Sequence, residues 1–135
     1  MTIDLGKLKG ITPDMVAKLS DKGITNTDQL LAAAKTPASR RALAKELGAD
    51  AKGILLLANR ADLIRIKGIS NVFSELLEAA GVDTVKELAT RRADNLLTKV
   101  VDVNREKKIS GRMPTLELVQ DWINQAKELP KMLEY

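Results

Sequence analysis

Two short segments of this sequence gather the side chains best suited to contacting phosphate groups. Each segment places basic residues just before a glycine and a hydroxyl residue just after it. Lysine and arginine attract phosphate by charge, and a hydroxyl group can donate a hydrogen bond to it, so such contacts recognise a nucleic-acid backbone without reading its base sequence. The candidate nucleic-acid-binding residues are Lys7, Lys9, Gly10, Thr12 and Lys18 at the first segment, and Arg65, Lys67, Gly68 and Ser70 at the second.

The sequence contains few of the residue types and patterns that catalysis commonly uses. The sequence contains no cysteine and no histidine, which excludes disulfide bonds, thiolate nucleophiles, zinc sites of the ordinary type and imidazole bases. The carboxylates are scattered, and the spaced pair Asp102 and Glu106 lies near an expected linker. We therefore expect a protein that is not an enzyme and that has no catalytic residue, no metal site and no cofactor.

The composition is that of a globular protein with a mild basic excess. Of the 135 residues, 44% are hydrophobic and 30% are charged, and the net charge is +4. Aromatic residues make up only 2%, too few to build a platform on which unpaired bases would stack. If a nucleic acid binds, the backbone of a duplex is therefore a better candidate than a single strand.

A membrane location is not expected. The longest apolar run, Gly53–Ala58, is far shorter than the roughly twenty residues that a membrane-spanning helix needs. The first residues, Met1-Thr2-Ile3-Asp4, show no secretory pattern. The sequence therefore favours a cytoplasmic protein.

The chain contains an internal repeat with an offset of 58 residues. Residues 4–30 align without a gap on residues 62–88, with 8 identities in 27 positions. The identities fall mainly on glycines and on periodic apolar positions, as expected for two copies of one structural unit. We expect the apolar residues that the copies share to be buried, namely Leu5, Leu8, Ile11 and Leu19 in the first copy and Leu63, Ile66, Ile69 and Leu77 in the second.

Each copy predicts a helix, a hairpin, a second helix, a turn and a third helix. The hairpin begins at a glycine, Gly10 or Gly68, which can adopt the positive φ that often follows a helix. Thr12 and Ser70 are placed to cap the next helix through their side-chain oxygens. These elements would bring the basic residues and the hydroxyl residues together at the tip of each hairpin.

The segments that follow each copy are also predicted to be helical. Helices are expected from Thr36-Pro37 to Leu47, from Asp50 into the second copy, over 93–103, and from Pro114-Thr115 to Pro130, with 104–113 as a linker. Trp122 lies on the apolar face of the last of these helices and is expected in the core. The adjacent pairs Arg40-Arg41 and Arg91-Arg92 are expected to be solvated. The fold class is all-α, with halves 1–58 and 59–135 forming one compact unit.

The repeat resembles the helix-hairpin-helix motif of sequence-independent DNA-binding proteins. Over almost its full length, and most clearly at 81–88 and 122–127, the chain is similar to a bacterial and archaeal family of helix-hairpin-helix-like proteins known as a domain of unknown function. The resemblance implies tandem helix-hairpin-helix repeats in a SAM-like helical bundle, followed by a C-terminal amphipathic helix. It also implies that each hairpin offers backbone N–H groups at a helix N-terminus to a phosphate. Thr12 and Ser70 stand where that motif usually has its second glycine.

Two classes of partner follow from these observations. The resemblance favours double-stranded DNA, gripped through its phosphates, with the first hairpin favoured because it has more lysines. The alternative is a protein partner or self-association, since hairpins of this kind also serve as corners between packed helices. The oligomeric state is left open by the sequence.

Overall fold

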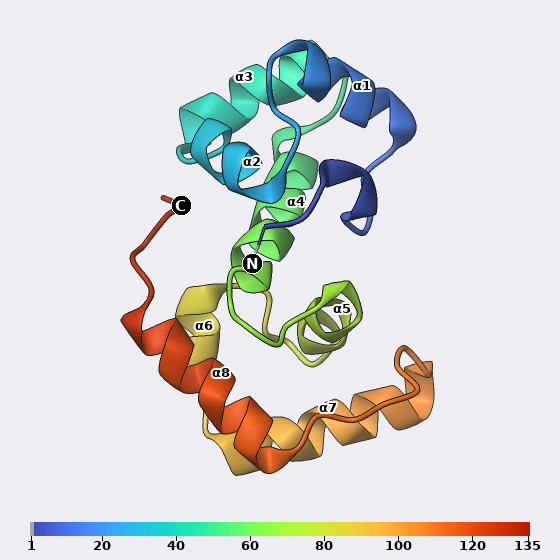
Figure 1. Cartoon of the computed structure of the whole chain (residues 1–135), viewed down its shortest axis with the longest axis vertical. Helices are drawn as coiled ribbons and strands as arrows, with labels where there is room; N and C mark the ends of the chain where they lie inside the picture. The colour runs from blue at the N-terminus through green and yellow to red at the C-terminus, as the bar shows by residue number, and fades with distance from the viewer. Residues whose placement is uncertain (1) are drawn as a thin grey trace. The chain divides into compact units, whose positions relative to one another are not determined.

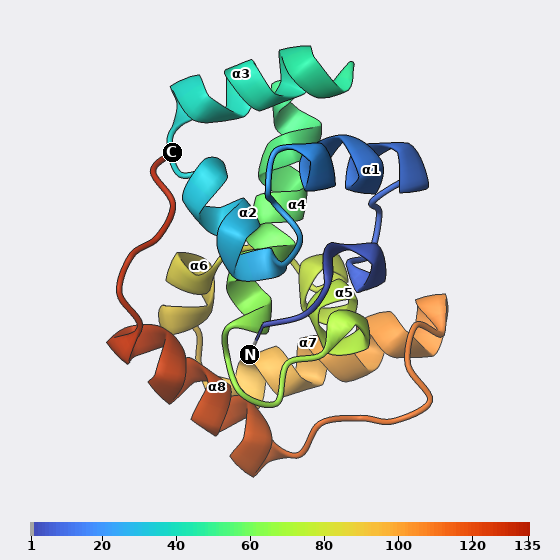
Figure 2. The same cartoon turned by 45° about the horizontal axis from the view of Figure 1, so that its top comes forward.

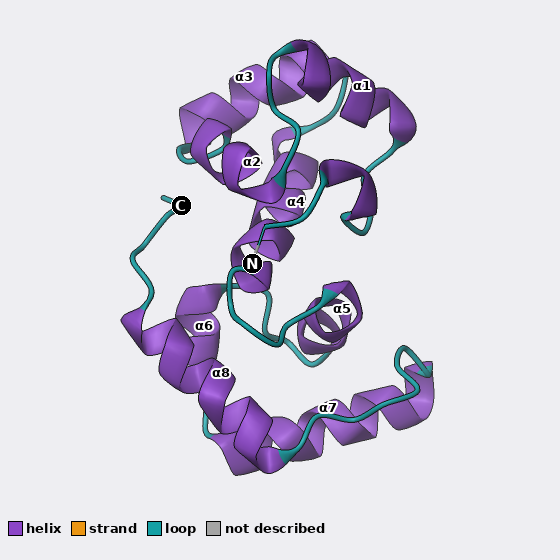
Figure 3. Ribbon diagram, in the orientation of Figure 1, coloured by secondary structure: helices purple, strands orange, loops and turns teal. Residues whose placement is uncertain are grey.

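The computed structural model describes residues 2–135, and within this range the chain is helical throughout its regular structure (Figure 1, Figure 3). One isolated β-bridge joins Asp4 and Asn26, and no strand forms among the described residues. The predicted all-α fold class is confirmed.

The chain divides into two compact units. Unit 1 contains the described residues up to Asp62 together with Pro130–Tyr135, and unit 2 contains Leu63–Leu129. Unit 2 is therefore one continuous stretch of sequence, whereas unit 1 is built from two stretches separated by unit 2. The division into halves 1–58 and 59–135 of one compact unit stays a prediction.

Each α-helix of unit 1 begins at a polar capping residue. Its elements are the 3-10 helix η1 (Leu5–Lys7) and the α-helices α1 (Pro13–Asp21), α2 (Thr27–Ala33), α3 (Pro37–Leu47) and α4 (Ala51–Ile64). Thr36 and Ser39 cap each other's backbone N–H groups at the start of α3, and the carboxylate of Asp50 accepts the N–H of Gly53 at 2.8 Å. These starts agree with the sequence because a cap and its partner lie only three residues apart.

Unit 2 continues from the end of α4 through four further helices. They are α5 (Asn71–Ala79), α6 (Val85–Ala89), α7 (Ala93–Lys107) and α8 (Leu116–Glu128). Trp122 of α8 is 1% exposed at the centre of the core, with its ring 5.4 Å from that of Phe73. The prediction that Trp122 belongs to the core is confirmed. Apolar residues of all four helices surround it: Leu76, Leu77, Val85, Leu88, Leu96, Val100, Val119, Ile123 and Ala126.

The same backbone hydrogen bonds recur 58 residues apart in the two units. At the hairpins, the N–H of Ile11 reaches the carbonyl of Leu8 at 3.4 Å, and the N–H of Ile69 reaches that of Ile66 at 3.1 Å. After the next helix, the bonds from Ile24 to Leu19 and from Val82 to Leu77 measure 2.9 and 2.8 Å. Glycines 10, 23, 68 and 81 all have positive φ. The two aligned segments therefore share their local backbone structure.

One apolar position of the repeat was predicted wrongly. Seven of the eight expected core residues are buried, but Ile11 is partly exposed whereas its counterpart Ile69 is buried. In unit 2, Trp122 and Leu118 pack over the hairpin that contains Ile69. In unit 1, the helix at the equivalent place presents Arg60, whose thin polar guanidinium covers less apolar surface than an indole ring.

The predicted linker 104–113 is also corrected, because α7 continues to Lys107. Lys108 then adopts a left-handed conformation with φ of 51°. The side-chain amide of Asn104 donates to the carbonyl of Ser110 and accepts the N–H of Ser110, both at 2.8 Å. The segment is thus a hydrogen-bonded turn at the end of a helix.

The last residues of the sequence return to unit 1. We call Pro130–Tyr135 the return segment; its Leu133 is 1% exposed. The N–H of Glu134 donates to the carbonyl of Lys35 at 2.8 Å, and Figure 2 shows the end of the chain beside the connection between α2 and α3. The hydroxyl of Tyr135 donates to Asn59 of α4 at 3.1 Å.

Arg40 of α3 is the residue that fixes this arrangement. It is 4% exposed, so the prediction that it is solvated is wrong. Its guanidinium donates to the carbonyls of Ala34 at 2.8 Å, of Lys35 at 3.2 Å and of Glu134. The carbonyls at the end of α2 carry the negative end of the helix dipole, which explains how a buried cation is accommodated there.

Candidate nucleic-acid interface

The first candidate segment forms an exposed turn in unit 1. Lys7 is the last residue of η1, Lys9 and Gly10 form the turn, and Thr12 caps α1 by accepting the N–H of Met15 at 3.2 Å. All four candidates lie within six residues and are exposed. The structure therefore brings Lys7, Lys9, Gly10 and Thr12 together at one tip, which we call hairpin 1.

The second candidate segment forms the equivalent turn in unit 2. Ser70 caps α5 by accepting the N–H of Phe73 at 3.3 Å, and Gly68 has a φ of 96°. Lys67, Gly68 and Ser70 are exposed, and Arg65 is half-buried. We call the turn made by these four residues hairpin 2.

In both units a side chain of the last long helix binds the backbone carbonyl just before the hairpin glycine. In unit 1, Arg60 of α4 donates to the carbonyl of Lys9 at 2.7 Å. In unit 2, the amide of Gln125 of α8 donates to the carbonyl of Lys67 at 3.1 Å and accepts the N–H of Lys67 at 2.9 Å. A side chain of the same unit therefore fixes the backbone of each hairpin.

The hairpin glycines are required by this internal packing. A Cβ atom on Gly10 would lie 2.3 Å from the guanidinium of Arg60, and one on Gly68 would lie 2.9 Å from Nε1 of Trp122. Either distance is too short for a real contact. The sequence indicated a role for both glycines but not this one, because Arg60 and Trp122 lie about fifty residues away along the chain.

The positive charge near hairpin 1 is lower than its number of lysines suggests. Lys18 is ion-paired with Asp14 at 3.1 Å, and Lys22 is ion-paired with Glu46. Asp14 also lies in the first turn of α1, where a carboxylate offsets the positive end of the helix dipole. The first turn of α5 contains no acidic residue. The structure thus reduces the electrostatic advantage that the sequence gave to hairpin 1.

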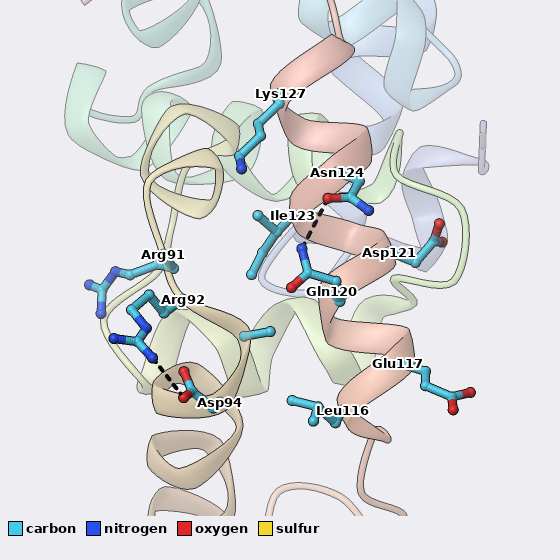
Figure 4. Close-up of a pocket in the computed structure, with 11 residues that line it drawn as sticks. Arg91, Arg92, Asp94, Leu116, Glu117, Gln120, Asp121, Ile123, Asn124 and Lys127 are labelled. Carbon is cyan, nitrogen blue, oxygen red and sulfur yellow. Dashed lines mark hydrogen bonds and ion pairs between the residues drawn. The ribbon is translucent and has the colours of Figure 1, made fainter.

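Unit 2 has a groove of about 750 Å³ between the start of α7 and one face of α8 (Figure 4). Arg92 and Asp94 form an ion pair at 3.0 Å on one side of it, and Asn124 accepts a hydrogen bond from Gln120 at 3.0 Å on the other. Sequence reasoning missed this groove because it joins residues that are remote along the chain. It is lined by Arg91, Arg92, Ala93, Asp94, Leu116, Glu117, Gln120, Asp121, Ile123, Asn124 and Lys127.

Asp94 in this groove provides a prediction about pH. The backbone N–H of Asn95, which donates at 2.8 Å, and the guanidinium of Arg92 hold the pKa of the Asp94 carboxyl below its ordinary value. The ionised carboxylate therefore favours the folded state above the unfolded-state pKa, and this contribution disappears as the pH falls through the folded-state pKa. We expect Arg92→Ala to raise the pKa only in part, because the bond from Asn95 remains. A carboxyl-detected NMR titration measures this, and an unchanged pKa would contradict it.

Two kinds of feature are absent from the described part of the chain, residues 2–135. No cluster of three or more carboxylates in this part is arranged to share a metal ion. No helix in it has both the length and the apolar character needed to cross a bilayer.

Fold and site together define an all-helical protein whose two units each present a glycine hairpin in front of a capped helix. The model of a family described as a domain of unknown function (DUF4332) matches residues 9–129. Since the match covers most of the sequence, including hairpin 2 and residues 9–12 of hairpin 1, the chain belongs to this family. No curated protein and no solved structure matches the chain.

Proposed function

We propose that this protein is a non-enzymatic module that binds the phosphate backbone of double-stranded DNA without sequence preference. In this proposal the two units are tandem helix-hairpin-helix repeats of the SAM-like type. The observation that carries it is the recurrence, 58 residues apart, of an exposed lysine, a glycine of positive φ and a hydroxyl-capped helix N-terminus. A cytoplasmic location belongs to the same proposal and is favoured by the absence of cysteine.

The chemistry of each hairpin suits a phosphate group. The first turn of a helix carries N–H groups without intrahelical partners and the positive end of the dipole, both of which attract an anion. The hydroxyls of Thr12 and Ser70 accept a backbone N–H, so their own hydrogens remain available to donate to a phosphate oxygen. Lys9 and Lys67 directly precede the hairpin glycines and add positive charge.

The remaining basic candidates contribute to different degrees. Lys7 and Arg65 are the first residues of their hairpins and add to the positive potential of the same tips. Lys18 contributes least, because it would have to leave its ion pair with Asp14 to contact a phosphate. Both hairpins are fixed in place by Arg60 and Gln125, so little order would have to be gained on binding.

The test is the salt dependence of binding to a duplex of arbitrary sequence. With about four phosphates neutralised, the logarithm of the binding constant should fall with the logarithm of the salt concentration with a slope of about −3.6. The double variant Lys9→Ala with Lys67→Ala should reduce the magnitude of that slope by up to about 1.8, equally for all sequences. No detectable binding at about 50 mM salt would refute the proposal.

A matched control separates specific contacts from net charge. Lys52 and Lys99 are exposed on α4 and α7, one in each unit, so Lys52→Ala with Lys99→Ala removes the same charge away from both hairpins. This control should keep the wild-type slope. Trp122 is the only tryptophan and lies against Gly68, so a change in its emission on binding reports on hairpin 2.

Protein binding is the second candidate function, and the groove of unit 2 favours it. Leu116 lines the groove and is 49% exposed, so it offers an apolar contact to a partner. Binding there would be weakened by Leu116→Glu and left unchanged by Lys9→Ala with Lys67→Ala. Failure of the duplex experiment together with an association that Leu116→Glu weakens would favour this function.

A further inference from the structure

The return segment is bound to unit 1 in the way that a short peptide is bound to a receptor. Leu133 supplies a buried apolar anchor, and Glu134 supplies two main-chain hydrogen bonds, one donated to Lys35 and one accepted from Arg40. The hydroxyl of Tyr135 donates to Asn59. Main-chain bonds with pockets for alternate side chains are a common mode of peptide recognition.

The receiving residues are held in place by the body of unit 1. We call Ala34, Lys35, Arg40 and Asn59 the docking site. Two of the three carbonyls that Arg40 binds, those of Ala34 and Lys35, belong to the end of α2 and not to the return segment. The guanidinium is therefore positioned by contacts within residues 34–40, and its Nη2 is directed at a peptide carbonyl from outside that stretch.

The hydrogen bonds of the return segment do not depend on its covalent connection. They join residues 134 and 135 to residues 35, 40 and 59, whereas the segment is attached to the end of α8 in unit 2. Lys131, within the connecting residues, is exposed. A return segment of identical sequence on another molecule offers the same anchor and the same hydrogen bonds.

We propose that the docking site of unit 1 is a peptide-binding site that accepts the return segment of a second copy of this chain in exchange for its own. The ligand class is an extended peptide with a buried leucine, one residue bonded through its main chain and a tyrosine hydroxyl. Reciprocal exchange of this kind produces a closed dimer with no contacts that a single chain lacks. This proposal is independent of nucleic-acid binding.

Two complementary full-length variants test the exchange. Leu133→Glu removes the apolar anchor of the return segment and leaves the docking site intact. Arg40→Ala removes a hydrogen-bond donor of the docking site and leaves the return segment intact. Each variant alone should be monomeric in sedimentation experiments, and their mixture should contain a 1:1 complex. Circular dichroism checks that Arg40→Ala stays folded, because exposed core residues of a partly unfolded chain would associate non-specifically.

A labelled peptide of residues 129–135 provides the second measurement. It should bind Leu133→Glu saturably in fluorescence anisotropy, and it should bind wild type more weakly because the native segment competes. A control peptide with alanine in place of Leu133 should bind at least about 10-fold more weakly, since burial of the leucine is lost. If Leu133→Glu loses its helical circular dichroism, Leu133→Ala serves as the acceptor.

Support requires both the mixed complex and saturable peptide binding. Peptide binding without the complex would overturn the second copy as occupant. A complex without peptide binding would mean that the chains associate through another surface. The absence of both would show that the return segment is a fixed part of unit 1.

Discussion

Arg40→Ala should lower the free energy of unfolding of unit 1 by about 3 kcal/mol. The substitution removes a buried guanidinium and leaves the carbonyls of Ala34 and Glu134 without this donor, whereas the carbonyl of Lys35 keeps the N–H of Glu134. Hydrogen bonds to charged groups are among the strongest in proteins, and buried acceptors without partners are costly. Urea unfolding followed by far-ultraviolet circular dichroism measures the loss.

The neighbouring arginine is a matched control for this effect. Arg41 is exposed on the same helix, so Arg41→Ala changes the charge equally and should change the stability by less than about 0.5 kcal/mol. Equal losses from the two variants would show that charge alone matters and would contradict the assigned role of Arg40. Trp122 lies in unit 2, so its fluorescence shows whether the destabilisation spreads beyond unit 1.

Gly68→Ala should cost about 3 kcal/mol, more than the same change at Gly81, which also has a positive φ. Part of the cost is the strained backbone, because φ is 96° at this position. The other part is the contact that the new methyl group would make with Nε1 of Trp122 at 2.9 Å in a closely packed core. Chemical denaturation followed by tryptophan fluorescence measures the total.

Gly81→Ala separates these two contributions. Gly81 has a similar φ of 93°, but a Cβ atom there would meet its nearest neighbour, Arg91, at an ordinary 3.8 Å. Its cost should therefore be the strain alone, about 1 to 2 kcal/mol. In a Trp122→Phe background, which lacks the indole nitrogen and is followed by far-ultraviolet circular dichroism because no tryptophan remains, Gly68→Ala should cost about 1 kcal/mol less than in wild type. Equal costs in both backgrounds would contradict the proposed clash.

Sequence reasoning succeeded where the physical cause is local. Thr12 and Ser70 cap their helices as predicted, because the donor that each one satisfies lies three residues further along the chain. The hairpin glycines adopt positive φ for a similar reason, since the backbone must reverse directly after a helical turn. The burial of Trp122 followed from the apolar face of a single helix.

The remaining features depend on contacts across long stretches of sequence. Arg60 and Lys9 are 51 residues apart, Gln125 and Lys67 are 58 apart, and Arg40 and Glu134 are 94 apart. No periodicity within a helix encodes such a pair. The sequence therefore did not distinguish Arg40 from a solvated arginine, and only the folded structure shows that it is buried.

The division of unit 1 between two stretches of sequence has a consequence for the order of events during synthesis. Residues 2–62 leave the ribosome first, but Leu133 and Glu134 follow only after all of unit 2. At roughly 5 to 20 residues per second, the delay is roughly 4 to 14 seconds. Unit 2, which is continuous in sequence, can finish folding within that interval. During this interval the docking site around Arg40 is not yet occupied by its own return segment. On a crowded polysome, the return segment of a neighbouring chain is close enough to compete for this site.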